Sequence, residues 1–214
     1  MKITLIYDNE VYTEGLKSDW GFSCLIEGED MPSILFDTGA NGSLLLHNME
    51  KLTIDPLSID MVFISHAHWD HTGGLSSFLN KNKEVKIYIP GSCPEPKDGI
   101  EIIKVVEPLE ICNGVFSTGE LKGVEQSLAV KTEKGLAVIV GCSHPGVENI
   151  LKSASQFGSL YALVGGLHGF SQFDEIKALE LVCPCHRTQF KSVIRSLYPK
   201  EYIDDDAGRI INID

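Results

Sequence analysis

The sequence of 214 residues has no long hydrophobic run. Its apolar stretches, such as Leu136–Val140, are far shorter than the roughly 20 residues that a membrane-spanning helix needs. The segment Met1–Asp8 reads as a short strand that meets charge too soon for a signal peptide. We therefore expect no membrane partner and a cytoplasmic location.

Basic residues are also scarce. The chain holds 18 Lys and Arg against 30 Asp and Glu, which gives a formal net charge of −12. Because a protein that binds nucleic acid needs a basic surface for the phosphate backbone, we expect no nucleic-acid partner. The acidic run Asp204–Asp206 is interpreted as a solvated turn. No pattern in the sequence specifies an oligomeric state.

Cysteines with the spacing of redox or zinc-ribbon motifs are missing. Cys183-Pro184-Cys185 lacks the two-residue spacer of those motifs. Cys142 lies in an apolar run, where free cysteine packs as a small buried hydrophobe. We expect reduced thiols rather than disulfides, with Cys185 near any site that involves the adjacent His186. The six cysteines are Cys24, Cys93, Cys112, Cys142, Cys183 and Cys185.

The chain shows no linker, low-complexity segment or short repeat, so we expect a single domain over residues 1–214. Hydrophobic residues make up 43% of it, which is enough for a sizeable core. Each half shows short strands followed by strand–helix units. Two such halves predict an α/β fold in which two sheets pack together with helices outside, a four-layer αβ/βα sandwich.

The expected elements follow from apolar runs, helical spacing and breaker residues. Expected helices cover 43–52 and 75–79, a third runs from Pro145 to a stop at Gly158, and the last runs from a Thr188 cap to Leu197. The expected strands are 2–7, 21–27, 33–36, 59–64, 85–89, 102–106, 109–116, 127–132, 136–140, 160–164, 181–183, 202–203 and 210–213.

The segment His66–His71 carries four groups able to bind a metal within six positions. Side chains two apart in an extended segment share a face, so His66 and His68 can point the same way. Asp70 and His71 follow where the chain turns. One histidine in such a run is more often structural, but packing does not explain three with an aspartate, because these groups are costly to bury unpaired. The segment therefore predicts a metal site.

Three further histidines, His144, His168 and His186, each come after an apolar strand. Ligands of α/β proteins collect at the carboxyl ends of strands. Each histidine alone could equally be a neutral residue with its hydrogen bonds satisfied. Together with the cluster at 66–71 they favour a metal centre. His47 lies in a leucine-rich helix and is expected to be structural.

The segment His66–His71, with Leu35–Gly39 upstream and His144 and His186 downstream, resembles the metallo-beta-lactamase superfamily. The resemblance covers essentially the whole chain. It implies that Asp37 orients a ligand from behind. It also implies two ligand sets for divalent ions, His66, His68 and His144 for one and Asp70, His71 and His186 for the other.

One position departs from the superfamily pattern. Where the family usually has a bridging aspartate, this chain has His168. A neutral imidazole cannot bridge two cations as a carboxylate does. The alternatives are two ions joined only by hydroxide, one tightly and one weakly bound ion, or a single ion. His168 stays among the candidate ligands. We expect two ions, with zinc first and iron, manganese or nickel as alternatives.

Three segments resemble a particular branch of the superfamily, labelled dihydropterin-ribofuranosylaminobenzene phosphate synthase-like: Val140–Gly146, Gly165–His168 and Cys183–His186. That branch is connected with joining a pterin diphosphate to an aminobenzene ribose phosphate. One fold hosts many reactions, so the label is a guide to chemistry rather than to substrate.

Our first functional hypothesis is a metal-dependent hydrolase that uses a metal-activated water on a small phosphorylated or cyclic-ester substrate. In it, Asp70 is both ligand and proton acceptor, and His168 orients the substrate or protonates the leaving group. The alternatives are a pterin-related transferase in which an aromatic amine displaces diphosphate, and a non-catalytic protein that senses a metal or ligand. Specificity is expected to come from the loops 8–19, 90–99 and 169–173, with Trp69 either lining the pocket or packing beneath a helix.

Overall fold

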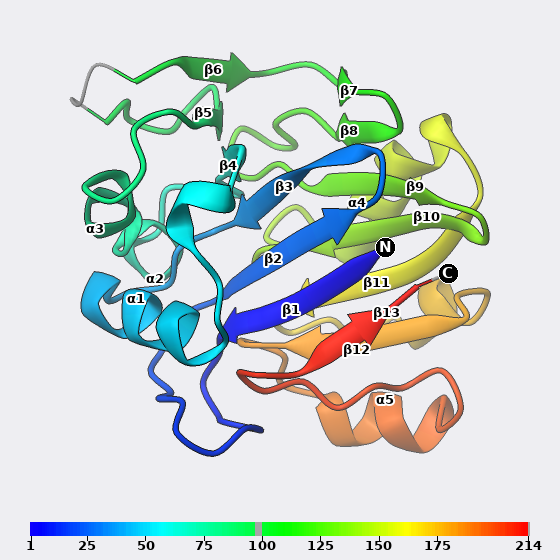
Figure 1. Ribbon diagram of the computed structural model, residues 1–214. Coiled ribbons are helices and arrows are strands. Elements are labelled where there is room, and N and C mark those ends of the chain that lie inside the picture. The colour runs from blue at the N-terminus through cyan, green and yellow to red at the C-terminus, as the bar shows by residue number, and fades with distance from the viewer. Residues whose placement is uncertain (97–99, 214) are drawn as a thin grey trace.

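The computed structural model describes residues 1–96 and 100–213, and two sheets form its centre (Figure 1). The first sheet has the spatial order β13 (Ile210–Asn212), β1 (Lys2–Tyr7), β2 (Ser23–Gly28), β3 (Met31–Phe36), β4 (Met61–Phe63), β5 (Lys86–Pro90) and β6 (Ile102–Val105). The second has the order β12 (Leu181–Cys185), β11 (Leu160–Gly166), β10 (Gly135–Val140), β9 (Leu128–Thr132), β8 (Val115–Ser117) and β7 (Leu109–Cys112).

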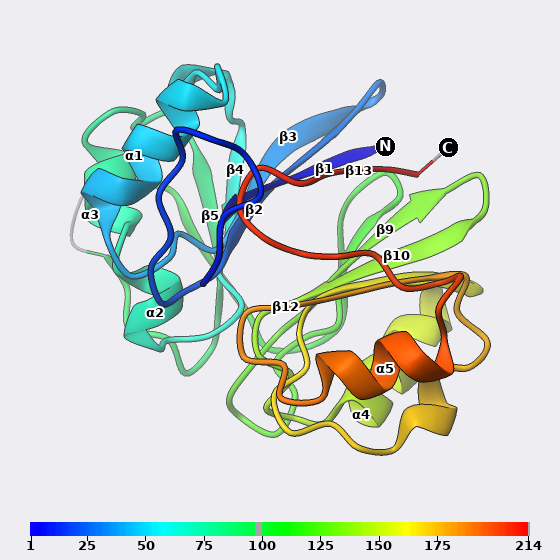
Figure 2. The same cartoon turned by 90° about the horizontal axis from the view of Figure 1, so that it is seen from below.

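Helices cover the outer face of each sheet, as Figure 2 shows. The first sheet is covered by α1 (Gly42–Lys51), α2 (Trp69–Thr72) and α3 (Leu75–Leu79), and the second by α4 (Val147–Ala154) and α5 (Lys191–Leu197). Short 3₁₀ turns are η1 (Pro56–Ser58), η2 (Ser155–Phe157) and η3 (Phe173–Ile176). In the described part of the chain, no helix has both the length and the apolar character to cross a bilayer.

Three buried apolar clusters separate the layers. Strand β10 shows how the alternation of a strand creates two of them, because Ile139 faces the first sheet and Val138 faces the helices. Leu45 of α1 packs in the third cluster, between the first sheet and its helices. An apolar layer between the sheets and one beneath each set of helices confirm the predicted four-layer αβ/βα sandwich.

Parallel pairing brings the carboxyl ends of several strands to one edge. In the second sheet, Val140 of β10 lies opposite Gly165 of β11, and Gly166 lies opposite Cys185 of β12. In the first sheet, β3 and β4 are also parallel. The segments that follow these strands therefore leave the sandwich side by side, which is where ligands bind in α/β proteins.

Two expected strands were wrong in part. The single strand expected over 109–116 is a hairpin, because Asn113-Gly114 is a turn and Gly114 has a φ of 76°. The strand expected at 202–203 is only an isolated bridge between Val182 and Tyr202. The expected specificity loop 90–99 lies outside the described residues at 97–99.

Two expected helix starts were also wrong. The last helix begins at Lys191 and not after Thr188, because the Thr188 hydroxyl donates to the Cys185 carbonyl and accepts from the backbone N–H of Leu167. The helix expected from Pro145 begins at Val147. Thr188 belongs instead to the loop that follows β12, and Pro145 to the loop that follows β10. These loops carry candidate site residues.

Candidate metal centre

The segment that follows β4 turns its polar side chains toward one volume. His66 comes three residues after the strand and is fully buried, and His68 is the exposed N-cap residue of α2. Asp70 and His71 lie in the single turn of α2 and are both buried. A strand end followed at once by a helical turn thus gathers the four side chains that the sequence predicts to act together.

Left-handed backbone occurs at His168 and His186, at the residue before His144, and at Asp37. Asp37, Ser143, His168 and His186 have φ values of 54°, 60°, 49° and 45°. Such left-handed conformations are uncommon for residues with a side chain. All four follow strands at the same edge of the sandwich, and strain of this kind gathers at functional sites.

The first candidate ligand set contains His66, His68 and His144. One ring nitrogen from each lies within 4.8 Å of the others. The Nε2 of His66 is 3.0 Å from the Nδ1 of His68, and the His144 ring centroid is 4.9 Å from that of His66. Among the described residues, the buried Nε2 of His144 has no hydrogen-bond partner. These nitrogens can serve as three of the four ligands of a tetrahedral site.

The second candidate ligand set contains Asp70, His71 and His186, also within 4.8 Å of one another. The Oδ2 of Asp70 lies 3.3 Å from the Nε2 of His186 and 4.0 Å from the Nε2 of His71. His186 Nε2 is buried and has no hydrogen-bond partner in the part of the chain that the structure describes. Two buried, unpartnered nitrogens, one in each set, fit a pair of bound cations.

Asp37 holds the cluster from behind. Its Oδ1 accepts from the backbone N–H of Ser65 at 2.7 Å, and its Oδ2 accepts from the Ser65 hydroxyl at 2.7 Å. The same Oδ2 lies 2.7 Å from His71 Nδ1. A proton on that Nδ1 leaves the lone pair of Nε2 facing the other candidate ligands, as carboxylates do for metal-bound histidines.

Sequence reasoning did not find the residues that hold His186 and Asp70. The Nδ1 of His186 lies 3.0 Å from Asn9 Oδ1, although 177 positions separate the two residues. The backbone N–H of His186 donates to Asp8, and the indole N–H of Trp20 donates to Asp70 Oδ2 at 3.0 Å. The loop expected to set specificity, residues 8–19 with Trp20 at its edge, therefore also positions candidate ligands.

Glu125 was likewise missed. Its buried carboxylate accepts four backbone N–H groups, from Gly141, Cys142, Ser143 and His144, over distances of 2.8 to 3.1 Å. Burial raises the pKa of Glu125 to about 7, although the hydrogen bonds from the loop act against that shift. Glu125 thereby fixes the loop that follows β10 and with it the position of His144.

The neutral state of the buried histidines favours cation binding at this cluster. Burial, with the charge of the neighbouring His68, lowers the pKa of His144 to about 4. Burial also lowers the pKa values of His66, His71 and His186 below their ordinary value. The rings are therefore neutral near pH 7 and offer free lone pairs. Neutral imidazoles and one carboxylate are a donor set suited to zinc and neighbouring divalent ions.

His168 lies beside the cluster rather than within a three-ligand group of the described residues. Its ring centroid is 5.2 Å from that of His144. The two histidines line a recess of about 270 Å³, together with residues of the loop 169–172 and the start of α4. The metal-ligand role expected for His168 stays a prediction, and its position suits contact with a molecule in the recess.

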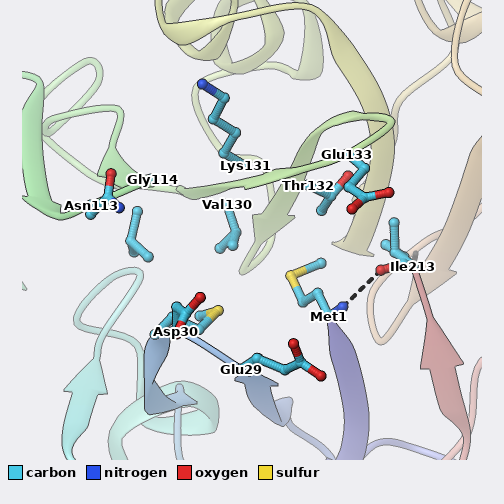
Figure 3. Close-up of a pocket in the computed structure, with 13 residues that line it drawn as sticks. Met1, Glu29, Asp30, Asn113, Gly114, Val130, Lys131, Thr132, Glu133 and Ile213 are labelled. Carbon is cyan, nitrogen blue, oxygen red and sulfur yellow. Dashed lines mark hydrogen bonds between the residues drawn. The ribbon is translucent and has the colours of Figure 1, made fainter.

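Two other features lie away from the histidines. All six cysteines are free. Cys185 lies in a group with Asp8 and Asp205. Lys191 forms an ion pair with Asp205. A larger cavity, of about 760 Å³, opens at the opposite end of the sandwich. It lies between Met1 and Asp30 on one side and Val130 and Glu133 on the other (Figure 3). No candidate metal group of the described residues lines this cavity.

Known proteins resemble the chain over nearly its whole length. The family model described as Metallo-beta-lactamase superfamily matches residues 21–161. A 7,8-dihydropterin-6-methyl-4-(beta-D-ribofuranosyl)-aminobenzene-5'-phosphate synthase from Methanocaldococcus jannaschii is 31% identical, with 97% of this chain and 95% of the relative covered. The uncharacterized protein MJ0448 from the same organism is 26% identical, over 99% of this chain and all of the relative (100%).

Solved structures share the fold. Tm1679, a metal-dependent hydrolase of the beta-lactamase superfamily, superposes with a TM-score of 0.82 at 27% identity, over 100% of this chain and 99% of that chain. YhfI from Bacillus subtilis, a metallo-beta-lactamase fold protein, gives a TM-score of 0.71 at 14% identity, with 99% of both chains covered. At 14% identity, the match to YhfI shows a shared fold and nothing further.

Proposed function

Because the chain belongs to the metallo-beta-lactamase superfamily, as its motif predicts, we propose that it is a metal-dependent hydrolase of small phosphorylated or cyclic-ester molecules. One observation carries the proposal. Two neighbouring three-ligand sets, each with a buried unpartnered nitrogen, lie beside a recess that His168 lines. Such an arrangement supports two divalent ions, with zinc first, next to a bound small molecule.

In the proposed hydrolysis, Asp70 and His168 have different roles. Divalent ions, when bound, supply water of lowered pKa and polarise a phosphoryl or carbonyl oxygen. Burial alone would raise the pKa of the Asp70 carboxyl, but the nearby His186, whose Nε2 lies 3.3 Å from Asp70 Oδ2, and the charge of His71 hold that pKa below its usual value. Asp70 is thus ionised, as a metal ligand must be, and it is the carboxylate to which we assign the role of proton acceptor. His168, on the recess, orients the substrate or donates a proton to the leaving group.

Arg187 supports an anionic substrate. Its guanidinium lies 5.5 Å from the centre of the Trp20 ring, and burial together with the charge of Arg187 lowers the pKa values of His144 and His168. Within residues 1–96 and 100–213, no carboxylate lies within ion-pair distance of Arg187. A half-buried guanidinium without an acidic partner is suited to hold a phosphate or carboxylate through paired N–H donors.

Arg187→Ala should therefore weaken substrate binding more than turnover. We expect KM for a phosphorylated substrate to rise about tenfold or more, since charge-assisted hydrogen bonds contribute roughly 1.5–3 kcal/mol. Arg187→Lys should recover part of the loss, because it restores the charge but not the planar fork. Steady-state kinetics of wild type, Arg187→Ala and Arg187→Lys on one substrate measure the separate effects on KM and kcat. An unchanged KM in the alanine variant would exclude an anion-binding role for Arg187.

A second candidate function is a transferase in which an aromatic amine displaces diphosphate from a pterin-type substrate. The synthase at 31% identity favours it, since that protein's name describes a methylpterin joined to an aminobenzene ribose phosphate. Two exposed aromatic side chains favour it too. Trp69, between His68 and Asp70 in the sequence, is 64% exposed, and Trp20 is 43% exposed. Such faces can stack on a planar heterocycle.

One assay separates the candidates. The metal-loaded protein is incubated with a pterin diphosphate, with and without an aminobenzoate-type acceptor, alongside a panel of phosphoesters and lactones. Hydrolysis of the panel without acceptor supports the hydrolase, and diphosphate release that requires the acceptor supports the transferase. Metal binding without any turnover would instead favour a non-catalytic sensor of metal or ligand.

A further inference from the structure

Cys142 lies in the middle of the candidate metal centre, where the sequence suggests only packing. Its side chain is 0% exposed. The Sγ atom is 3.1 Å from the Nε2 of His71. One ligand atom from each of Cys142, His66 and His71 lies within 4.8 Å of the others. Because His66 belongs to one candidate set and His71 to the other, the sulfur lies between the two sets.

The backbone fixes this sulfur in place. The N–H of Cys142 donates to Glu125 Oε1 at 3.0 Å. Ser143 has a left-handed φ of 60°, and its hydroxyl donates to the Gly166 carbonyl at 2.7 Å. A side chain on Gly141 would meet the Ser65 hydroxyl at 2.2 Å, so the loop packs directly against the segment that holds His66. Cys142 therefore has little freedom to turn away from the histidines.

The contact with His71 has the geometry of two ligands on one ion. Because His71 Nδ1 contacts Asp37, its Nε2 lone pair points toward the sulfur. Bonds of about 2.0 Å to nitrogen and about 2.3 Å to sulfur at a tetrahedral ion place the two ligand atoms roughly 3.5 Å apart. The observed 3.1 Å is close to that separation. The unpartnered Nε2 of His186 points to a ligand in the same cluster.

Without bound ions, burial and then the charge of Glu125 raise the pKa of the Cys142 thiol, so only bound cations would make its sulfur anionic. Two divalent ions bring four positive charges, whereas the two candidate sets contain one carboxylate, that of Asp70, and otherwise neutral imidazoles. The position after β11 holds His168, which adds no negative charge at neutral pH. A thiolate between the sets would supply the second anionic ligand, and a metal-bound thiol is deprotonated.

We propose that the thiolate of Cys142 is a ligand of the metal centre, shared by or adjacent to both ions. The inference rests on the proposed metal-dependent function. On binding, the S–H bond breaks and its proton passes to solvent, while the sulfur electron pair forms the bond to the metal. A thiolate ligand makes the centre favour thiophilic ions such as zinc and cobalt over manganese and magnesium.

Cobalt substitution tests the proposal without relying on activity. Wild-type protein loaded with Co²⁺ should show a thiolate-to-cobalt charge-transfer band in the near ultraviolet in addition to the visible cobalt bands. Cys142→Ser and Cys142→Ala should lose the charge-transfer band, keep visible bands and bind Co²⁺ at least roughly tenfold more weakly. Cobalt uptake should release one proton fewer in the alanine variant than in wild type.

Two controls identify the sulfur. Cys185→Ser removes the thiol of the other candidate group, beside Asp8 and Asp205, and should keep the band. Cys112→Ser removes a half-buried thiol of β7 and should also keep it. X-ray absorption at the cobalt edge of wild-type protein should reveal a sulfur scatterer together with imidazoles. Repeated on Cys185→Ser, this last measurement needs no Cys142 variant, so it decides the matter even where Cys142 variants do not fold.

The outcomes distinguish a failure of the Cys142 proposal from a failure of the metal centre itself. Cobalt bound without a sulfur scatterer, or a charge-transfer band that survives in both Cys142 variants, would overturn the role of Cys142 and leave the metal centre standing. A wild-type protein that binds no divalent ion would overturn both. Loss of the band in the Cys142 variants alone, with a sulfur scatterer in wild type, supports the thiolate ligand.

Discussion

His66→Ala should remove the ion of the first ligand set and catalytic activity together. His66 is fully buried, its Nε2 lies 3.0 Å from His68 Nδ1, and its ring is packed against those of His71 and His144. Alanine cannot supply the missing lone pair. Loss of residues behind a ligand costs 10–100-fold in affinity or activity, so loss of a ligand itself should cost more than roughly 100-fold.

Elemental analysis and turnover measure this effect, and thermal unfolding gives an independent readout. A bound ion stabilises the folded protein by about 2.7 kcal/mol at a hundred times its Kd, so added zinc should raise the Tm of wild type more than that of His66→Ala, which keeps the second ligand set. His47→Ala is the matched control, because His47 lies on α1 and contacts the carbonyl of Gly15. A His66→Ala protein without metal but with full turnover would refute the proposed function.

The parts of the site that are close in sequence could be predicted. Segment 66–71 compresses four candidate ligands into a strand end and one helical turn, so local geometry alone brings them together. His144, His168 and His186 were placed from the rule that parallel strands present their carboxyl ends at one edge. The register of β10, β11 and β12 has that arrangement.

Contacts between distant segments could not be predicted. Glu125 and Asn9 look like ordinary polar residues in the sequence. The pairing of strands within the second sheet brings Glu125 to His144, and the packing of the two sheets brings Asn9 to His186. Nothing local signals such a role, because hydrogen bonds to backbone groups leave no residue pattern. The burial of the Glu125 carboxylate is what indicates its role, and that burial is known only from the structure.

Cys142 shows a different limit. Its apolar neighbours predict a buried residue, and it is buried. Hydrophobic patterning does not distinguish a cysteine that packs in the core from one whose sulfur faces polar groups at the end of a strand. Its separation from His144 by one residue, with Ser143 in a left-handed conformation between them, is what turns the sulfur toward His71.

Glu125→Ala should be among the most destabilising single substitutions in the chain. It would leave four N–H groups of the loop 141–144, three of them in buried hydrogen bonds, without their acceptor. Each unsatisfied buried group costs about 1–3 kcal/mol, and water entering the vacated space offsets part of the sum, so we expect a loss of about 3 kcal/mol or more. Urea unfolding of the metal-free protein at pH 8, where the carboxylate is ionised, measures it.

Glu125→Gln and Glu133→Ala refine this prediction. The amide oxygen of Gln can still accept from the three N–H groups that now contact Oε1, while its NH₂ would face the N–H of His144, so a smaller loss of about 1–3 kcal/mol is expected. Glu133 is exposed at the turn between β9 and β10, and its substitution should stay within about 0.5 kcal/mol. If Glu125→Ala unfolds at the same urea concentration as Glu133→Ala, Glu125 does not hold the loop. Metal affinity would then not depend on Glu125, because a loop that keeps its position without the carboxylate also keeps His144 in position.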